Sequence, residues 1–164
     1  MDRLLTELVA LLRAILAAQQ RMLKLALARR EAMRAFDIER LEILVELERA
    51  ESLTLAELDK RRQGLVAQFR TLLGHGVEPS VSVIAGRCSE PVRGQLLGLA
   101  AQIKDVVEQV DRNTRINATV SETVVKGLAK VLKIVTGMAQ HAGLYMRNGR
   151  KAALRGIHLL EITA

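Results

Sequence analysis

One helical stripe runs without a break through residues 89–138. Apolar and small polar residues recur there at alternating steps of four and three, which keeps them on one side of an α-helix. The stripe consists of Leu96, Ala100, Ile103, Val107, Val110, Thr114, Asn117, Ser121, Val124, Leu128, Val131, Val135 and Met138. At ~1.5 Å per residue, a helix over this stretch is on the order of 75 Å long. The pattern predicts a long helix at about 89–140, with a polar layer at its centre that either contacts water or meets a partner's polar groups.

Two further periodic stretches precede this one, at about 2–35 and 37–73. The first has an unbroken apolar stripe, whereas Glu48 and Glu51 interrupt the stripe of the second. The basic first stretch and the acidic start of the second favour an antiparallel hairpin, in which Asp37 caps the second helix. Because neither glycine nor proline marks residues 35–37, one continuous helix is the alternative.

The composition is typical of long helices. The only aromatic residues are Phe36, Phe69 and Tyr145, and leucine, alanine, valine, arginine and glutamate dominate. We therefore expect an all-α fold in one helical domain over 1–164: an elongated antiparallel hairpin packed on a third long helix, in a coiled-coil-like bundle. For residues 141–164 two structures stay open, a short C-terminal helix on the hairpin or a flexible tail that becomes ordered on a partner.

The formal net charge of +7 is unevenly distributed. Between residues 123 and 160 there are seven basic residues and no acidic one. Such a segment indicates an acidic partner, nucleic acid or an anionic membrane surface, or else an ordinary solvated helix face.

The single cysteine, Cys88, excludes an intramolecular disulfide, so a reducing compartment is the simplest expectation. The apolar N-terminal stretch is interrupted by Arg13 and Arg21, unlike a signal peptide. Furthermore, no run reaches the ~18 apolar residues that a membrane span requires. We expect a cytoplasmic protein without stable membrane insertion.

The residues that usually carry catalysis are scattered. His75, His141 and His158 lie on different predicted elements, without acidic or cysteine neighbours at ligand spacing. Cys88 has no histidine nearby to activate it. We therefore predict no enzyme activity, no catalytic residues, no cofactor and no metal site.

Two motifs in the second half resemble a known family. An N-x-x-x-N pair, Asn113 and Asn117 in DRNTRIN, lies at the centre of the long helix, and a Tyr-x-x-x-Gly element, Tyr145 to Gly149, follows it. In the first half, FDIERLEILVELE is similar to the family's turn and second helix. With these motifs the chain resembles the FlgN-type flagellar export chaperones. It departs from them at the turn, where the family commonly has a glycine–aspartate pair and this chain has Phe36-Asp37.

The resemblance implies a cytoplasmic type III secretion chaperone. Such a protein binds hook-associated proteins of the hook–filament junction, prevents their premature association, and delivers them to the export apparatus, whose components are further expected partners. The implied partner-binding residues are Asn113, Asn117, Val124, Leu128, Val131, Leu132, Val135, Met138, Tyr145, Gly149, Leu154, Ile157 and Leu160. Lys126, Lys130 and Lys133 would steer an acidic segment of the client. No nucleic-acid partner is implied, and the chain is expected to be a monomer or a weak homodimer.

Two other classes of protein fit part of the pattern. A homodimeric coiled-coil scaffold or adaptor would explain the heptad-like stripe equally well. A basic helical protein that binds nucleic acid or a membrane surface would explain the charge of the second half, although the scarcity of aromatic residues disfavours a stacking platform for single strands.

Overall fold

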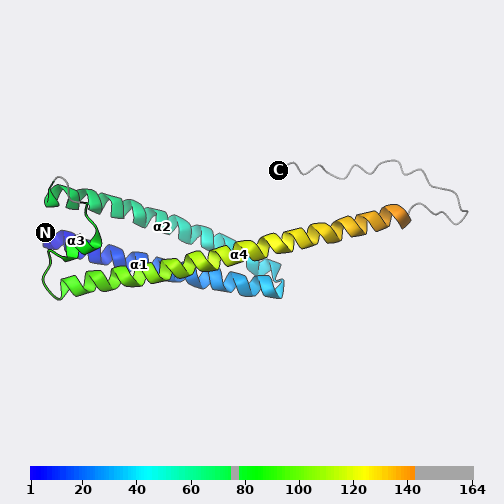
Figure 1. Ribbon diagram of the computed structural model, residues 1–164, viewed down its shortest axis with the longest axis horizontal. Coiled ribbons are helices and arrows are strands. Elements are labelled where there is room, and N and C mark those ends of the chain that lie inside the picture. Colours follow the sequence, from blue (N-terminus) through cyan, green and yellow to red (C-terminus); the bar gives the residue numbers. More distant parts are fainter. Residues whose placement is uncertain (75–77, 143–164) are drawn as a thin grey trace, which may run out of the picture. The chain divides into compact units, whose positions relative to one another are not determined.

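The computed structural model describes residues 1–74 and 78–142, with side chains described as far as Gly137. Every regular element in these ranges is a helix: α1 (Asp2–Ala35), α2 (Ile38–Leu73), α3 (Val81–Ala85) and α4 (Val92–Ala142) (Figure 1). The predicted all-α fold is therefore confirmed. The chain forms two compact units, Met1–Val120 and Ser121–Ala164, and the boundary between them falls within α4.

A tight turn joins α1 to α2 and makes them an antiparallel hairpin (Figure 1). The backbone N–H of Asp37 donates to the carbonyl of Ala32 (3.0 Å), and that of Phe36 donates to Met33 (3.3 Å). This pair of bonds is the Schellman motif, which needs a left-handed residue just after the helix. Phe36 takes that conformation, with φ of 54°. The Asp37 carboxylate then accepts from the backbone N–H of Arg40 (3.0 Å) and caps α2. The chain therefore turns at residues 36 and 37 rather than continuing as one helix.

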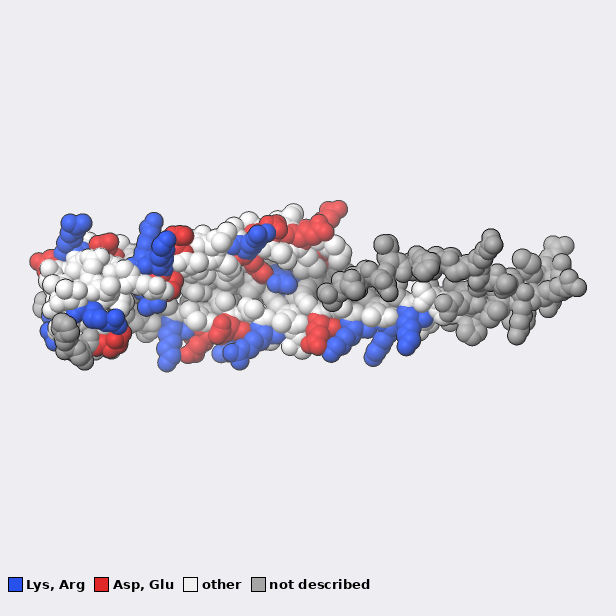
Figure 2. Space-filling view, turned by 90° about the horizontal axis from the view of Figure 1, so that it is seen from above, with Lys and Arg blue, Asp and Glu red and all other residues white. Residues whose placement is uncertain are grey.

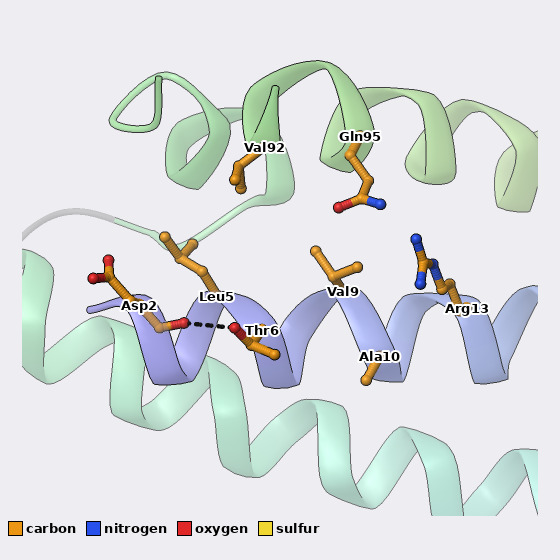
Figure 3. Close-up of a pocket in the computed structure, with 8 residues that line it drawn as sticks. All are labelled: Asp2, Leu5, Thr6, Val9, Ala10, Arg13, Val92 and Gln95. Atoms are coloured by element: carbon orange, nitrogen blue, oxygen red, sulfur yellow. Dashed lines mark hydrogen bonds between the residues drawn. The ribbon is translucent and has the colours of Figure 1, made fainter. Parts of the chain in front are cut away.

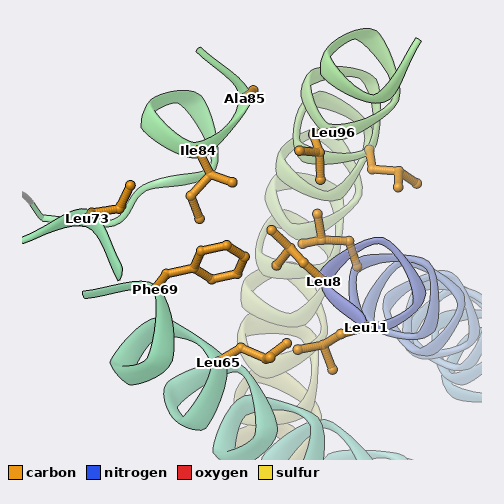
Figure 4. Close-up of a cluster of buried hydrophobic side chains, with 10 residues drawn as sticks. Leu8, Leu11, Leu65, Phe69, Leu73, Ile84, Ala85 and Leu96 are labelled. Carbon is orange, nitrogen blue, oxygen red and sulfur yellow. The ribbon is translucent and has the colours of Figure 1, made fainter. Parts of the chain in front are cut away.

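The core of the first unit lies toward the N-terminus of α1, where all four helices contribute leucines and other apolar side chains (Figure 4). Its buried members are Leu8, Leu11, Leu12, Leu65, Phe69, Leu73, Ile84, Ala85, Leu96 and Leu99. Phe69 of α2 and Leu96 of α4 are the largest fully buried side chains in the described part of the chain. The start of α4 therefore packs on the hairpin, and the predicted arrangement of a hairpin on a third long helix is confirmed.

Side chains cap the helices that follow the hairpin. The Ser80 hydroxyl accepts from the backbone N–H of Val83 (3.2 Å) at the start of α3. At the start of α4 the Glu90 carboxylate accepts from the backbone N–H of Gly94 (3.0 Å). α4 begins at Val92, three residues after the predicted start near residue 89, and the carbonyl of Ser89 accepts from the backbone N–H of Arg93 (3.2 Å) at this end.

For residues 141–164 the sequence left open a short C-terminal helix or a flexible tail. Residues 143–164 of this segment lie outside the described part of the chain. None of the described helices is both long and apolar enough to cross a membrane.

Candidate functional site

Two asparagines tie α4 to α1 within the first unit. Asn117 is only 3% exposed, and its Nδ2 donates to the main-chain carbonyl of Ala26 (2.7 Å). One turn earlier, Asn113 Oδ1 accepts from the Arg30 guanidinium (2.6 Å), while Asn113 Nδ2 donates to the carbonyl of Gln109 (2.7 Å). Paired contacts of this kind fix the register between two helices. The matching polar group for Asn117 is thus the main chain of α1.

A cavity of about 310 Å³ adjoins Asn117 and is lined by α1, α2 and α4. Exposed Thr114 is among its lining residues, and the ion pair between Arg29 and Glu48 (2.8 Å) borders it. Asn117 Oδ1 is buried and has no hydrogen-bond partner among the described residues. The polar layer is therefore uneven, because Thr114 is exposed while Asn117 is buried.

A second cavity, of about 420 Å³, lies between the beginnings of α1 and α4 (Figure 3). Leu5, Val9 and Val92 give it an apolar lining, with Arg13 and Gln95 at one end (Figure 3). The Thr6 hydroxyl in its lining donates to the main-chain carbonyl of Asp2 (3.0 Å) rather than to a side-chain base, so this cavity suits packing against an apolar group.

The described part of the second unit presents an aliphatic stripe, formed by Val124, Leu128, Val131, Leu132 and Val135 of α4. Leu128 is 59% exposed. The next three members of this row are similarly exposed: Val131 at 55%, Leu132 at 63% and Val135 at 56%. Val124 is half-buried. A contiguous row of exposed aliphatic side chains marks an interaction surface more often than an isolated exposed leucine does. We refer to these five residues as the aliphatic stripe.

Three lysines occupy the opposite side of the same helix. Lys126, Lys130 and Lys133 follow steps of four and three, so they share one face. At about 100° per residue, Lys126 and Lys130 each lie roughly 200° from Leu128 around the helix axis. All three lysines are exposed, and a row of basic side chains is visible there in Figure 2. The described end of α4 therefore has one aliphatic and one cationic face.

The described residues contain no group of three or more histidine, cysteine or acidic side chains able to hold a metal. The Cys88 thiol is half-buried and donates to the carbonyl of Ile84 (3.2 Å). Hydrogen bonds from Arg62 and Gln63 lower the pKa of Asp59, which favours its ionised form. Side chains of His75, His141 and His158 lie outside the described set. Among the described side chains, these residues therefore form no recognisable catalytic site.

The predicted partner-binding residues fall into three groups. Asn113 and Asn117 contact α1, and the members of the aliphatic stripe are the residues predicted between 124 and 135. The third group lies outside the described side chains: Met138, Tyr145, Gly149, Leu154, Ile157 and Leu160. Val125 and Ile134 of the same helix are also exposed, at 64% and 58%, and the sequence prediction did not include them.

A family model described as FlgN protein matches residues 1–153 of the chain. No matching relative was found among curated proteins or among solved structures. The family match extends over nearly the whole chain, so the family resemblance predicted from the sequence is confirmed.

Proposed function

This chain belongs to the FlgN family of flagellar export chaperones, and from that premise we propose that its aliphatic stripe binds hook–filament junction proteins in the cytoplasm before export. The observation that carries the proposal is the exposure of Leu128, Val131, Leu132 and Val135 along one helix face. A chaperone needs such a surface to cover an apolar segment of a client that would otherwise associate too early.

The client chemistry that suits this stripe is an amphipathic helix. An apolar helix face can pack against residues at i, i+4, i+7 and i+11, as Val124, Leu128, Val131 and Val135 are spaced. Full burial of a valine or leucine side chain contributes about 1.5–3 kcal/mol, so four such residues can supply a specific, reversible contact.

Within this proposal the asparagines and the lysines act indirectly. Asn113 and Asn117 position α4 on α1 through the bonds to Arg30 and Ala26. Lys126, Lys130 and Lys133 attract an acidic client segment from a distance, since they lie on the face opposite the stripe. Their charge reversal should slow association at low salt and leave the dissociation rate nearly unchanged.

Met138, Tyr145, Gly149, Leu154, Ile157 and Leu160 remain the proposed second part of the client contact. Their sequence offers apolar side chains among basic ones and several glycines, which suits a segment that adapts to a partner. Deletion of residues 141–164 should therefore weaken client binding while leaving the thermal midpoint nearly unchanged.

Isothermal titration with a C-terminal fragment of a hook–filament junction protein tests the proposal. The double variant Leu128→Asp/Val131→Asp should lose binding, because two carboxylates cannot be buried against an apolar helix. The double variant Thr119→Asp/Thr123→Asp adds the same charge on another face of α4 and should bind as the wild type does. Equal affinity of the stripe variant and the wild type would show that the contact lies elsewhere.

A further inference from the structure

Asn117 has a buried oxygen for which the surrounding helices supply no donor. The side chain is 3% exposed, and its Nδ2 is committed to the carbonyl of Ala26 (2.7 Å). Oδ1 is therefore the polar atom that Asn117 can still offer, and it has no hydrogen-bond partner within residues 1–74 and 78–142. Buried polar atoms in folded proteins are nearly always paired, so an unpaired acceptor indicates a group that arrives from outside the chain.

The cavity beside Asn117 has room for more than a water molecule. Its volume is about 310 Å³. One water requires only about 10–15 Å³ of such space, and sites for small organic groups begin at about 300 Å³. All of the lining residues belong to the first unit, Met1–Val120, and none belongs to the aliphatic stripe. We refer to this space as the three-helix cavity.

The walls of the three-helix cavity combine apolar side chains with neutral polar ones. Met22 of α1, Leu55 of α2 and Val107 of α4 are among its apolar residues. Gln19 and Thr114 also line it, and neither side chain makes a hydrogen bond within the described ranges. The cavity therefore offers one buried acceptor together with two side chains that can donate to a carbonyl.

The charges around the cavity favour a neutral ligand. Arg29 and Glu48 at its border neutralise each other in an ion pair (2.8 Å). A carboxylate ligand would face Glu48, Asp111 and the Asn117 oxygen, none of which can donate to it. A cation would be attracted by Asp111, but that side chain is exposed, and water screens it. The half-buried guanidinium of Arg30, bonded to α4 one turn before Asn117, repels a cation more effectively.

We propose that the three-helix cavity binds a primary carboxamide on a short apolar stem. The amide N–H donates to Asn117 Oδ1, the amide carbonyl accepts from the Thr114 hydroxyl, and the stem packs on the apolar walls. Thr114 and Asn117 are three residues apart on α4, so they are neighbours on one face. The carboxamide belongs either to a free small amide or to an asparagine or glutamine side chain of a bound polypeptide.

Titration of the full chain with isobutyramide, followed by two-dimensional ¹⁵N NMR, tests the proposal. The Nδ2 signals of Asn117 should shift saturably, with a dissociation constant on the order of 1 mM, as suits so small a ligand. Isobutyrate and isobutylammonium carry the same branched stem and should bind about tenfold more weakly, because each lacks half of the hydrogen-bonding pattern. Absence of a saturable shift, which means a cavity that holds only water, or equal binding of all three probes would overturn the proposal.

Two substitutions test the assigned atoms. Asn117→Leu removes the acceptor and should weaken isobutyramide binding about tenfold or more, and Thr114→Val removes an exposed hydroxyl at nearly constant shape and should weaken it about fivefold. Asn113→Ala is the control and should bind as the wild type does, because Asn113 contacts α1 without lining the cavity. Circular dichroism should show the same helix content for all three variants. Wild-type affinity for isobutyramide in either cavity variant would overturn the proposal.

The Thr114→Val variant also distinguishes the two sources of the carboxamide. If a client side chain occupies the cavity, the variant should bind a fragment of a hook–filament junction protein more weakly, and isobutyramide should compete with that fragment. If a free amide occupies it, the variant should lose affinity for isobutyramide alone. The isobutyramide result does not depend on client binding by the aliphatic stripe, so failure of either proposal is recognisable by itself.

Discussion

Phe36 holds a backbone conformation that suits glycine. Its φ of 54° closes the Schellman motif at the end of α1, and its side chain is 73% exposed. A left-handed conformation costs a residue with a Cβ atom about 1–2 kcal/mol, and an exposed phenylalanine recovers little of this through burial. The glycine–aspartate pair common in the family at this turn has a direct physical explanation here.

Phe36→Gly should therefore raise the free energy of unfolding by about 0.5–1 kcal/mol, since the gain in the turn exceeds the added entropy of the unfolded chain. Urea denaturation followed by circular dichroism measures the change. Phe36→Ala is the matched control and should show no comparable gain, because alanine keeps the Cβ atom. A loss of stability in the glycine variant would mean that the phenyl ring makes stabilising contacts.

Asn117 combines one useful hydrogen bond with one buried oxygen that has no partner among the described residues. The Ala26 carbonyl can keep its helical hydrogen bond without Asn117, whereas a buried acceptor left unpaired costs about 1–3 kcal/mol. Asn117→Leu should consequently leave the free energy of unfolding equal or raise it by about 1 kcal/mol.

Asn117→Ala separates packing from polarity at the same position. It also removes the unpaired oxygen but leaves space unfilled, so it should be less stable than the leucine variant by about 1–3 kcal/mol. Thermal and urea denaturation of both variants provide the comparison. A leucine variant clearly less stable than the wild type would mean that the bond to Ala26 outweighs the cost of the buried oxygen.

At the scale of whole elements, α4 changes its role along its length. Leu96 near its start is fully buried among α1, α2 and α3 side chains, whereas Leu132 near its described end is 63% exposed. Leu96→Ala should lower the free energy of unfolding by about 2–5 kcal/mol, and Leu132→Ala should change it by less than about 0.5 kcal/mol. Chemical denaturation of the two single variants measures this difference. Similar losses in both would indicate that the stripe belongs to a core.

The helices were predictable because their signals are local. The four-three spacing predicts the long helices, and Asp37 with the change of pattern around it predicts the turn that the capping bonds confirm. The polar layer was visible in the sequence, but its partner was not, since Asn117 binds a main-chain carbonyl and every residue has one. Likewise, the helical spacing placed the start of α4 near residue 89, but it did not predict that the Glu90 carboxylate accepts from the backbone N–H of Gly94 there.

The candidate site was predictable as a stripe, but its exposure was not. The same four-three spacing continues from Leu96, which is buried, to Leu128, which is 59% exposed. A repeating apolar pattern specifies the face of a helix but not whether another helix of the same chain covers that face. The exposure of the later residues was known only from the structure, in which α1, α2 and α3 pack on the earlier part of α4.

At the scale of the whole molecule, the first unit carries the stability of the fold, whereas we propose that the described end of α4 binds the client. The first unit contains the buried leucines, the capped helix ends and the asparagine contacts. The aliphatic stripe and the lysines occupy two opposite faces of one helix, and we propose that the stripe contacts the client while the lysines attract it from a distance.

Site-specific photo-crosslinking tests the central claim most directly. A photoreactive amino acid placed at Leu128 reports contacts of the aliphatic stripe, and one placed at Lys130 reports the opposite face of the same helix turn. With a hook–filament junction protein present in high salt, which screens the attraction between the client and the lysines, we expect strong client crosslinking from position 128 and little from position 130. Equal crosslinking from both positions, or crosslinking from position 130 alone, would contradict this claim.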